Sequence, residues 1–163
     1  MDNPFKGWRT LTSCLNNDSL MLVGLYSERA RQHIKEIKNK INELKLKSNY
    51  NNIIKFRKDL IENNDDHWNY IKSSPDFYTV SGVRDLLFHV QEHRFTISKI
   101  KEYLDKLGLI FLGFEDQLVK EKFKEIYSNK IDLYNLDKWE TFEKKNPRIF
   151  AGMYQFWCMK SKK

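Results

Sequence analysis

The chain has 163 residues, of which 40% are apolar and 14% aromatic, and it carries a formal net charge of +7. This length fits one domain or part of one, and the apolar content suffices for a buried core, which excludes wholesale disorder. There is no apolar run of the ~18–20 residues that a membrane-spanning helix needs, and no leader-type segment at the amino terminus. The two cysteines, Cys14 and Cys158, lack metal-ligand spacing. The sequence therefore predicts a reduced, cytoplasmic protein.

Basic residues are concentrated in the first 64 positions, which hold 12 Lys and Arg against 7 Asp and Glu. The remaining positions hold 17 basic and 15 acidic residues. A basic segment can supply the salt-dependent part of nucleic-acid binding. The chain is also rich in Asn, Lys and Ile, a bias that genome composition produces without any ligand. Nucleic-acid binding is therefore kept as an alternative.

The chain is predicted to begin with a helix and a buried strand. Asn3 and Pro4 mark a helix start, because Asn can cap a helix and Pro fits its first turn. This helix is expected to end near Asn16, and its buried stripe comprises Trp8, Leu11 and Leu15. The continuous apolar run 20–26 is too short for a helix and does not alternate, which predicts a strand buried on both faces.

Three helices are predicted next. Two span 28–47 and 51–62, where apolar residues recur at intervals of three and four. Ser81 is expected to cap the third helix. Their expected apolar stripes are Ile34, Ile37, Ile41 and Leu44; Ile53, Phe56 and Leu60; and Val83, Leu86, Leu87 and Val90.

A second helix–strand pair is predicted after residue 95. Thr96 can cap a helix and Gly108 supplies its left-handed stop. The apolar run 109–114 predicts another strand buried on both faces, and a helix is expected over 117–127. The inward stripes are Ile97, Ile100, Leu104 and Leu107, and Val119, Phe123 and Ile126.

The carboxyl-terminal elements complete a helix-rich α/β fold. Asp137 and Glu140 resemble a capping box for one more helix, which Pro147 ends. The aromatic segment 153–159 predicts the third strand. Because two of the three strands are predicted to be covered on both faces, we expect this small sheet to be part of a larger one.

Four polar residues gather on the helix predicted after Ser81. Spacings of four and three place Asp85, His89 and Glu92 on one helical face, with His93 beside them. His and Glu side by side are a common general acid–base pair. Residues 89–93 also match the H-x-x-E-H pattern of zinc peptidases, but the pattern is short and no further ligand is identifiable, so no metal site is predicted. A set of polar residues satisfying one another at the helix rim is the simpler alternative.

Tyr26 lies at the end of the first predicted strand, followed by Ser27. In open α/β sheets, ligands bind beyond the carboxyl ends of the strands, which makes Tyr26 a candidate binding residue. It could equally be a core aromatic with its hydroxyl at the surface.

No G-x-G-x-x-G or G-x-x-x-x-G-K-[ST] motif occurs, so neither of these phosphate-binding loops is present in the sequence.

Four segments resemble class I S-adenosylmethionine-dependent methyltransferases. Residues 1–9 and 20–29 (LMLVGLYSER) are similar to the stretch after the fourth strand and to the fifth strand of that family. Residues 76–96 and 150–159 are similar to the carboxyl-terminal half of one bacterial branch, whose members are sometimes joined to tetratricopeptide repeats. The resemblance implies a partial Rossmann-like sheet, with the three predicted strands as its fifth, sixth and seventh. In this fold the seventh strand runs antiparallel.

The resemblance also implies a division of the single 1–163 domain fragment. Residues 28–95 would be a helical insertion on the methyl-acceptor side, and residues 96–163 the carboxyl-terminal strands and helices. His89 and Glu92 are then candidate catalytic bases, and Tyr26, Asp85 and His93 are candidate acceptor-binding residues.

Two departures from the family bear on activity. Asn17-Asp18-Ser19 replaces the usual Pro-Gly-Gly-like turn before the fifth strand. The first strand, its glycine-rich loop and the acidic residue that holds the cofactor ribose have no counterpart. We therefore expect the chain alone to bind no S-adenosylmethionine and to be inactive, because positioning is most of what such enzymes provide. The alternatives are a subunit of a split methyltransferase, completed by a chain with the missing half, and a non-enzymatic adaptor or RNA-binding protein using residues 28–58.

Overall fold

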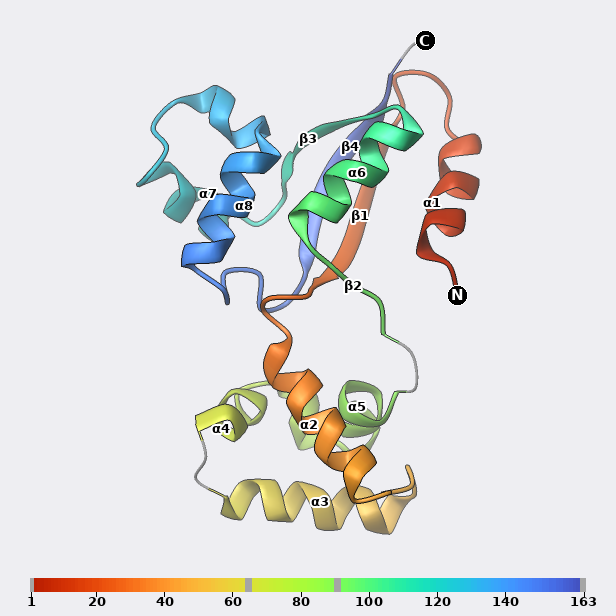
Figure 1. Cartoon of the computed structure of the whole chain (residues 1–163), viewed down its shortest axis with the longest axis vertical. Coiled ribbons are helices and arrows are strands. Elements are labelled where there is room, and N and C mark those ends of the chain that lie inside the picture. The colour runs from red at the N-terminus through yellow and green to blue at the C-terminus, as the bar shows by residue number, and fades with distance from the viewer. Residues whose placement is uncertain (1, 64–65, 90–91, 162–163) are drawn as a thin grey trace. The chain divides into compact units, whose positions relative to one another are not determined.

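A computed structural model describes residues 2–63, 66–89 and 92–161, which form two compact units (Figure 1). The sheet unit comprises Met1–Ala30 and His93–Lys163, and the helical unit comprises Arg31–Glu92. Each unit has its own hydrophobic core. In the described part of the chain, no helix has both the length and the apolar character needed to cross a membrane.

The sheet unit contains one mixed four-stranded sheet. Its strands are β1 (Leu20–Ser27), β2 (Arg94–Phe95), β3 (Leu109–Phe114) and β4 (Tyr154–Lys160), in the order β2-β1-β4-β3. β2 pairs with β1 in parallel, and β4 lies antiparallel to both β1 and β3. β1 and β3 therefore run parallel to each other. The three predicted strands and the antiparallel direction of the last are confirmed, whereas β2 is too short to leave a sequence pattern.

Helices cover one face of this sheet. α1 (Pro4–Ser13) packs Trp8 against Phe95 and Phe156, and α6 (Ile97–Leu107) runs across the sheet in Figure 1. The predicted stop is confirmed, because Gly108 has φ 64° in the left-handed region. Two of the predicted caps are also present: the side chains of Asn3 and Thr96 accept hydrogen bonds from Lys6 N and Lys99 N. The prediction that Ser81 caps a helix is wrong, because Ser81 lies within the helix Val80–Val83, which is capped by Thr79. The prediction for Leu11 is wrong, since this side chain is 58% exposed.

The opposite face of the sheet exposes large apolar side chains. Leu20, Leu22 and Ile110 are 56%, 49% and 44% exposed, and they alternate along β1 and β3 with residues of the core. Cross-strand pairing places Met159 opposite both Leu20 and Ile110, so these side chains form one apolar row. The prediction that both strands are buried on two faces is therefore wrong. The runs lack alternation because this exposed face is itself apolar.

The carboxyl-terminal helices complete the core beside the sheet. α7 (Gln117–Lys124) is followed by a 3₁₀ helix, η3 (Lys130–Tyr134), and by α8 (Leu136–Lys145), which carries the buried Trp139 and Phe142. α8 begins two residues earlier than predicted, because Asn135 is its cap and accepts from Asp137 N and Lys138 N. Ile126 lies beyond the end of α7 and is 56% exposed, so its predicted inward position is wrong.

The helical unit is built from short helices around an isoleucine- and leucine-rich core. α2 (Gln32–Glu43) and α3 (Tyr50–Glu62) bury the predicted stripes, except that Leu44 lies beyond α2 and is 55% exposed. Val90, the last member of the third predicted stripe, lies outside the described residues. The remaining elements are α4 (Asp66–Lys72), the 3₁₀ helix η1 (Pro75–Tyr78), α5 (Val80–Val83) and the π-helix η2 (Arg84–Phe88).

Candidate functional site

The helix that was expected to carry the polar cluster ends early. Asp85 lies in η2, which stops at Phe88, and His89 has an extended backbone with φ −64° and ψ 129°. Glu92 and His93 come after this break and lie outside any helix. The prediction of one helical face bearing Asp85, His89 and Glu92 is therefore wrong. The spacing assumed a continuous α-helix, whereas the chain passes through a π-turn into extended backbone.

The five candidate residues divide between the two units. Asp85, His89 and Glu92 belong to the helical unit, where Asp85 and His89 are exposed. Tyr26 and His93 belong to the sheet unit and are half-buried. Tyr26 lies on β1 directly opposite the first residue of β2. Neither unit by itself brings the five side chains together.

Glu92 is held by two basic side chains of the helical unit. Its Oε1 and Oε2 accept from Arg31 Nε and Nη2, both at 3.0 Å, and Lys38 Nζ lies 3.4 Å from Oε2. The Glu92 and Arg31 side chains are only 10% and 8% exposed. Burial acts to raise the pKa of Glu92, but the hydrogen bonds and charges of Arg31 and Lys38 outweigh it and hold the pKa below 4.5. Such a carboxylate stays ionised and is better suited to fixing Arg31 than to accepting a proton.

We expect Glu92→Gln to weaken the helical unit at neutral pH and to flatten its acid response. A lowered pKa in the native state gives stability that is present above the unfolded-state pKa and is lost as pH falls through the native value. The neutral amide cannot titrate, so the difference between wild type and variant should shrink as the pH drops below ~4. Urea unfolding between ~pH 3 and ~pH 7 measures it. A difference that is independent of pH would contradict a charged Arg31–Glu92 pair.

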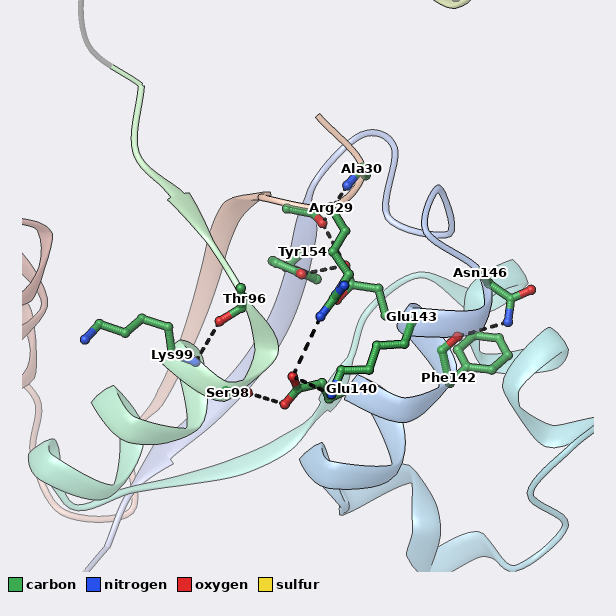
Figure 2. Close-up of polar contacts among 12 residues, drawn as sticks. Arg29, Ala30, Thr96, Ser98, Lys99, Glu140, Phe142, Glu143, Asn146 and Tyr154 are labelled. Atoms are coloured by element: carbon green, nitrogen blue, oxygen red, sulfur yellow. Dashed lines mark hydrogen bonds and ion pairs between the residues drawn. The ribbon is translucent and has the colours of Figure 1, made fainter. Parts of the chain in front are cut away.

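A second polar cluster surrounds Glu143, a fully buried residue of α8. Its Oε1 accepts hydrogen bonds from Ser27 Oγ at 2.7 Å and from the Tyr154 hydroxyl at 2.6 Å. Ser27 Oγ in turn accepts from Ala30 N at 3.0 Å. Figure 2 shows Tyr154 and Arg29 beside this carboxylate. One carboxylate oxygen thus joins the end of β1, the start of β4 and α8.

Arg29 closes the cluster on its outer side. Its Nε lies 3.6 Å from Glu143 Oε2, and its Nη2 lies 4.0 Å from Glu140 Oε1. Glu140 also accepts a hydrogen bond from Ser98 (Figure 2), and it forms an ion pair with Lys144. Both Arg29 Nε and Glu143 Oε2 are buried, and neither has a hydrogen-bond partner among the described residues. The cluster therefore keeps one carboxylate oxygen and one guanidinium N–H unsatisfied.

Burial shifts the pKa values within this cluster. Desolvation raises the pKa of Glu143 above 4.5, against the lowering effects of Tyr154, Ser27 and Arg29. Burial, followed by the neighbouring Glu143 charge, also raises the pKa of the Tyr154 hydroxyl. The cluster lies beyond the carboxyl end of β1, the position at which open α/β sheets bind ligands. Glu143 itself is fully enclosed, so its direct role is to order this end of β1, with Arg29 as the solvent-facing member.

Glu143 was not among the predicted site residues, although the sequence contains one signal for it. Glu143 follows Trp139 by four residues and Leu136 by seven, which places an acidic residue within the apolar stripe of α8. A charged residue on a buried helical face requires a partner. The partners, Ser27 and Tyr154, come from other elements, and the helix sequence does not identify them.

The residues at the carboxyl end of β1 do not fit S-adenosylmethionine. The segment that follows β1 has no glycine-rich turn. Its first acidic residue, Glu28, is paired with Arg94 at 3.1 Å and so is not free to bind ribose hydroxyls. No group of three or more His, Cys, Asp and Glu side chains within the described residues is arranged to hold a metal ion.

Comparison with known proteins shows no matching protein-family model and no curated protein with significant similarity to this chain. Inferences about function therefore rest on the residues, their contacts and the arrangement of the strands. The five predicted site residues and the Glu143 cluster differ in whether their side chains lie together within one unit. The Glu143 cluster gathers Ser27, Tyr154 and Arg29 around one fully buried carboxylate, whereas the five predicted residues are divided between the two units.

Proposed function

We propose that this chain is the carboxyl-terminal part of a class I S-adenosylmethionine-dependent methyltransferase. The observation that carries the proposal is the position of β4, which lies antiparallel between β1 and β3, while those two strands run parallel. The resemblance assigns this direction to the last strand of a Rossmann-like methyltransferase sheet.

The helical unit is the proposed acceptor side of this enzyme. It follows β1 in the chain and presents Asp85 and His89 to solvent. In this proposal His89 accepts a proton from the methyl acceptor, and Tyr26, Asp85 and His93 contribute to acceptor binding. Glu92 is the weaker catalytic candidate, because its pKa is lowered by its pairing with Arg31 and Lys38.

A partner chain carrying the cofactor-binding half is the proposed source of activity, and we expect none from this chain alone. β1 pairs with β4 along one edge. On its other edge β2 pairs with only Tyr26 and Ser27, so residues 20–25 have no strand partner on that edge among the described residues. Unpaired strand edges and exposed apolar faces recruit other chains. In this proposal the partner adds strands to the free edge of β1 and covers the row of Leu20, Met159 and Ile110. The two chains together would form a split methyltransferase, which we place in the cytoplasm.

Cofactor binding tests the proposal. Calorimetry should show no binding of S-adenosylhomocysteine to this chain alone up to ~1 mM. The complex obtained by co-expression with the protein encoded upstream should bind it. In the assembled enzyme His89→Ala should lower kcat by about 10²-fold or more, whereas His33→Ala, on another helix of the same unit, should not. Micromolar binding by this chain alone would refute the requirement for a partner. No binding after co-expression would refute the split enzyme.

Nucleic-acid binding is a second candidate function, supported by the charge of the α2–α3 region. Residues 28–58 contain ten Lys and Arg against three Asp and Glu, and Lys35, Lys40, Lys45 and Lys47 are exposed. A gel-shift assay with single-stranded RNA at ~50 and ~200 mM salt separates the two candidates. Binding that weakens steeply with salt favours the RNA-binding protein, and no shift at the lower salt eliminates it.

A further inference from the structure

A basic cleft lies on the sheet unit, and neither Glu143 nor its partners Ser27, Tyr154 and Arg29 line it. It has a volume of about 740 Å³ and lies between α7 and the segment that joins α8 to β4. Both helices are labelled in Figure 1. Three of the side chains that line the cleft are basic and one is acidic. The lining residues are Asp116, Leu118, Val119, Lys122, Lys145, Asn146, Pro147, Arg148 and Ile149.

The cleft carries an excess of positive charge. Lys122, Lys145 and Arg148 are exposed, and Lys122 and Lys145 form no ion pair within the described part of the chain. Asp116 is the one carboxylate, and it is engaged as the cap of α7, accepting from Val119 N at 3.1 Å. The amino end of α7 and the carboxyl end of α8 both border the cleft, so their dipoles oppose each other. The side chains therefore decide the sign of the local field, which favours an anion.

The walls of the cleft are partly apolar. Leu118 is 71% exposed, an unusual position for a large apolar side chain, and Pro147 and Ile149 lie in the opposite wall. The cleft is open to solvent, and its volume of about 740 Å³ far exceeds that of an inorganic anion, which leaves room for a small organic group. The cleft therefore suits a ligand that combines negative charge with an apolar body.

We propose that this cleft binds a small organic phosphate. The phosphate group would be bound by Lys122, Lys145 and Arg148, and the apolar body would pack against Leu118 and Ile149. A phosphate monoester carries a charge of about −1.5 to −2 near neutral pH, so Lys122 and Lys145 attract it more strongly than a single carboxylate. The arginine fork can bind two phosphate oxygens while the lysines act as point charges. This proposal is independent of the proposed methyl transfer.

Three probes applied to the full chain test the ligand class. Amide chemical shifts followed by NMR should show saturable binding of phenyl phosphate, with inorganic phosphate weaker by about 3–10-fold and benzoate weaker than phenyl phosphate. The shifted amides should lie in 116–122 and 145–149. Equal affinity for benzoate and phenyl phosphate would replace the phosphate assignment by a general carboxylate or anion site. No saturable binding of phenyl phosphate up to ~10 mM would overturn the proposal.

Charge variants locate the binding to this cleft. Lys122→Gln and Arg148→Gln should each weaken phenyl phosphate by about 3–10-fold. Asp116→Asn should tighten it, because Asn still caps α7 but no longer repels the anion. Lys124→Gln is the matched control, since Lys124 lies on the same helix outside the lining and should change the affinity by less than about 2-fold. Equal losses for Lys122→Gln and Lys124→Gln would show non-specific attraction and reject the site.

Discussion

Glu143→Ala is expected to lower the free energy of unfolding by about 2–6 kcal/mol, because two buried hydroxyls lose their acceptor and each costs about 1–3 kcal/mol. These are the hydroxyls of Ser27 and Tyr154, and both residues are fully buried. Urea unfolding at neutral pH, followed by tryptophan fluorescence, measures the loss. The matched control is Glu121→Ala on the surface of α7, which should stay within about 0.5 kcal/mol of wild type. A Glu143 variant as stable as this control would contradict the structural role of the cluster.

Glu143→Gln separates the charge of this residue from its hydrogen bonds. Burial raises the pKa of Glu143 in the native state above 4.5, so at pH values between 4.5 and the raised pKa the native state binds more protons than the unfolded state. The stability that this group contributes is therefore fully present below pH 4.5 and is lost as the pH rises through the native pKa. The amide retains an acceptor for the two hydroxyls, and we expect Glu143→Gln to lose less stability than Glu143→Ala and to remove this pH dependence. An unchanged dependence would show that another group titrates.

Gly82→Ala is expected to lower the stability of the helical unit by about 2 kcal/mol or more, because the new methyl group meets backbone. An added Cβ would lie 2.8 Å from Asp76 Cα and 2.8 Å from Thr79 Oγ1, and closer still to the Asp76 carbonyl oxygen. Relief requires η1 and α5 to separate, which would also disturb the cap in which Thr79 Oγ1 accepts from Gly82 N at 3.0 Å.

Gly152→Ala is the control for this change. An added Cβ at Gly152 meets no atom within 4 Å, so its stability should stay within about 0.5 kcal/mol of wild type. Thermal unfolding compares the two variants, and hydrogen exchange of residues 75–88 reports where the loss occurs. If both variants unfold at the same temperature, α5 is not packed against η1 as the structure shows.

Features that depend on neighbouring residues could be predicted from the sequence. The cap at Asn3 and the left-handed stop at Gly108 were found because both follow from local backbone geometry. The buried stripes of α2 and α3 were found, apart from Leu44, because periodic apolar residues direct one helical face inward. Length and apolar content likewise identified β1, β3 and β4 as strands.

Tertiary structure decided the remaining features, because they depend on residues far apart in the chain. Ser27 and Glu143 are 116 residues apart, and no local pattern pairs them. The helix ends at Phe88 although the spacing of Asp85, His89 and Glu92 favours its continuation. The face of β1 that carries Leu20 and Leu22 is as apolar as a buried one, so composition alone cannot show that these side chains are exposed. Spacing along a chain brings side chains together only within an unbroken element, and the packing of the whole fold determines where each element ends and what covers it.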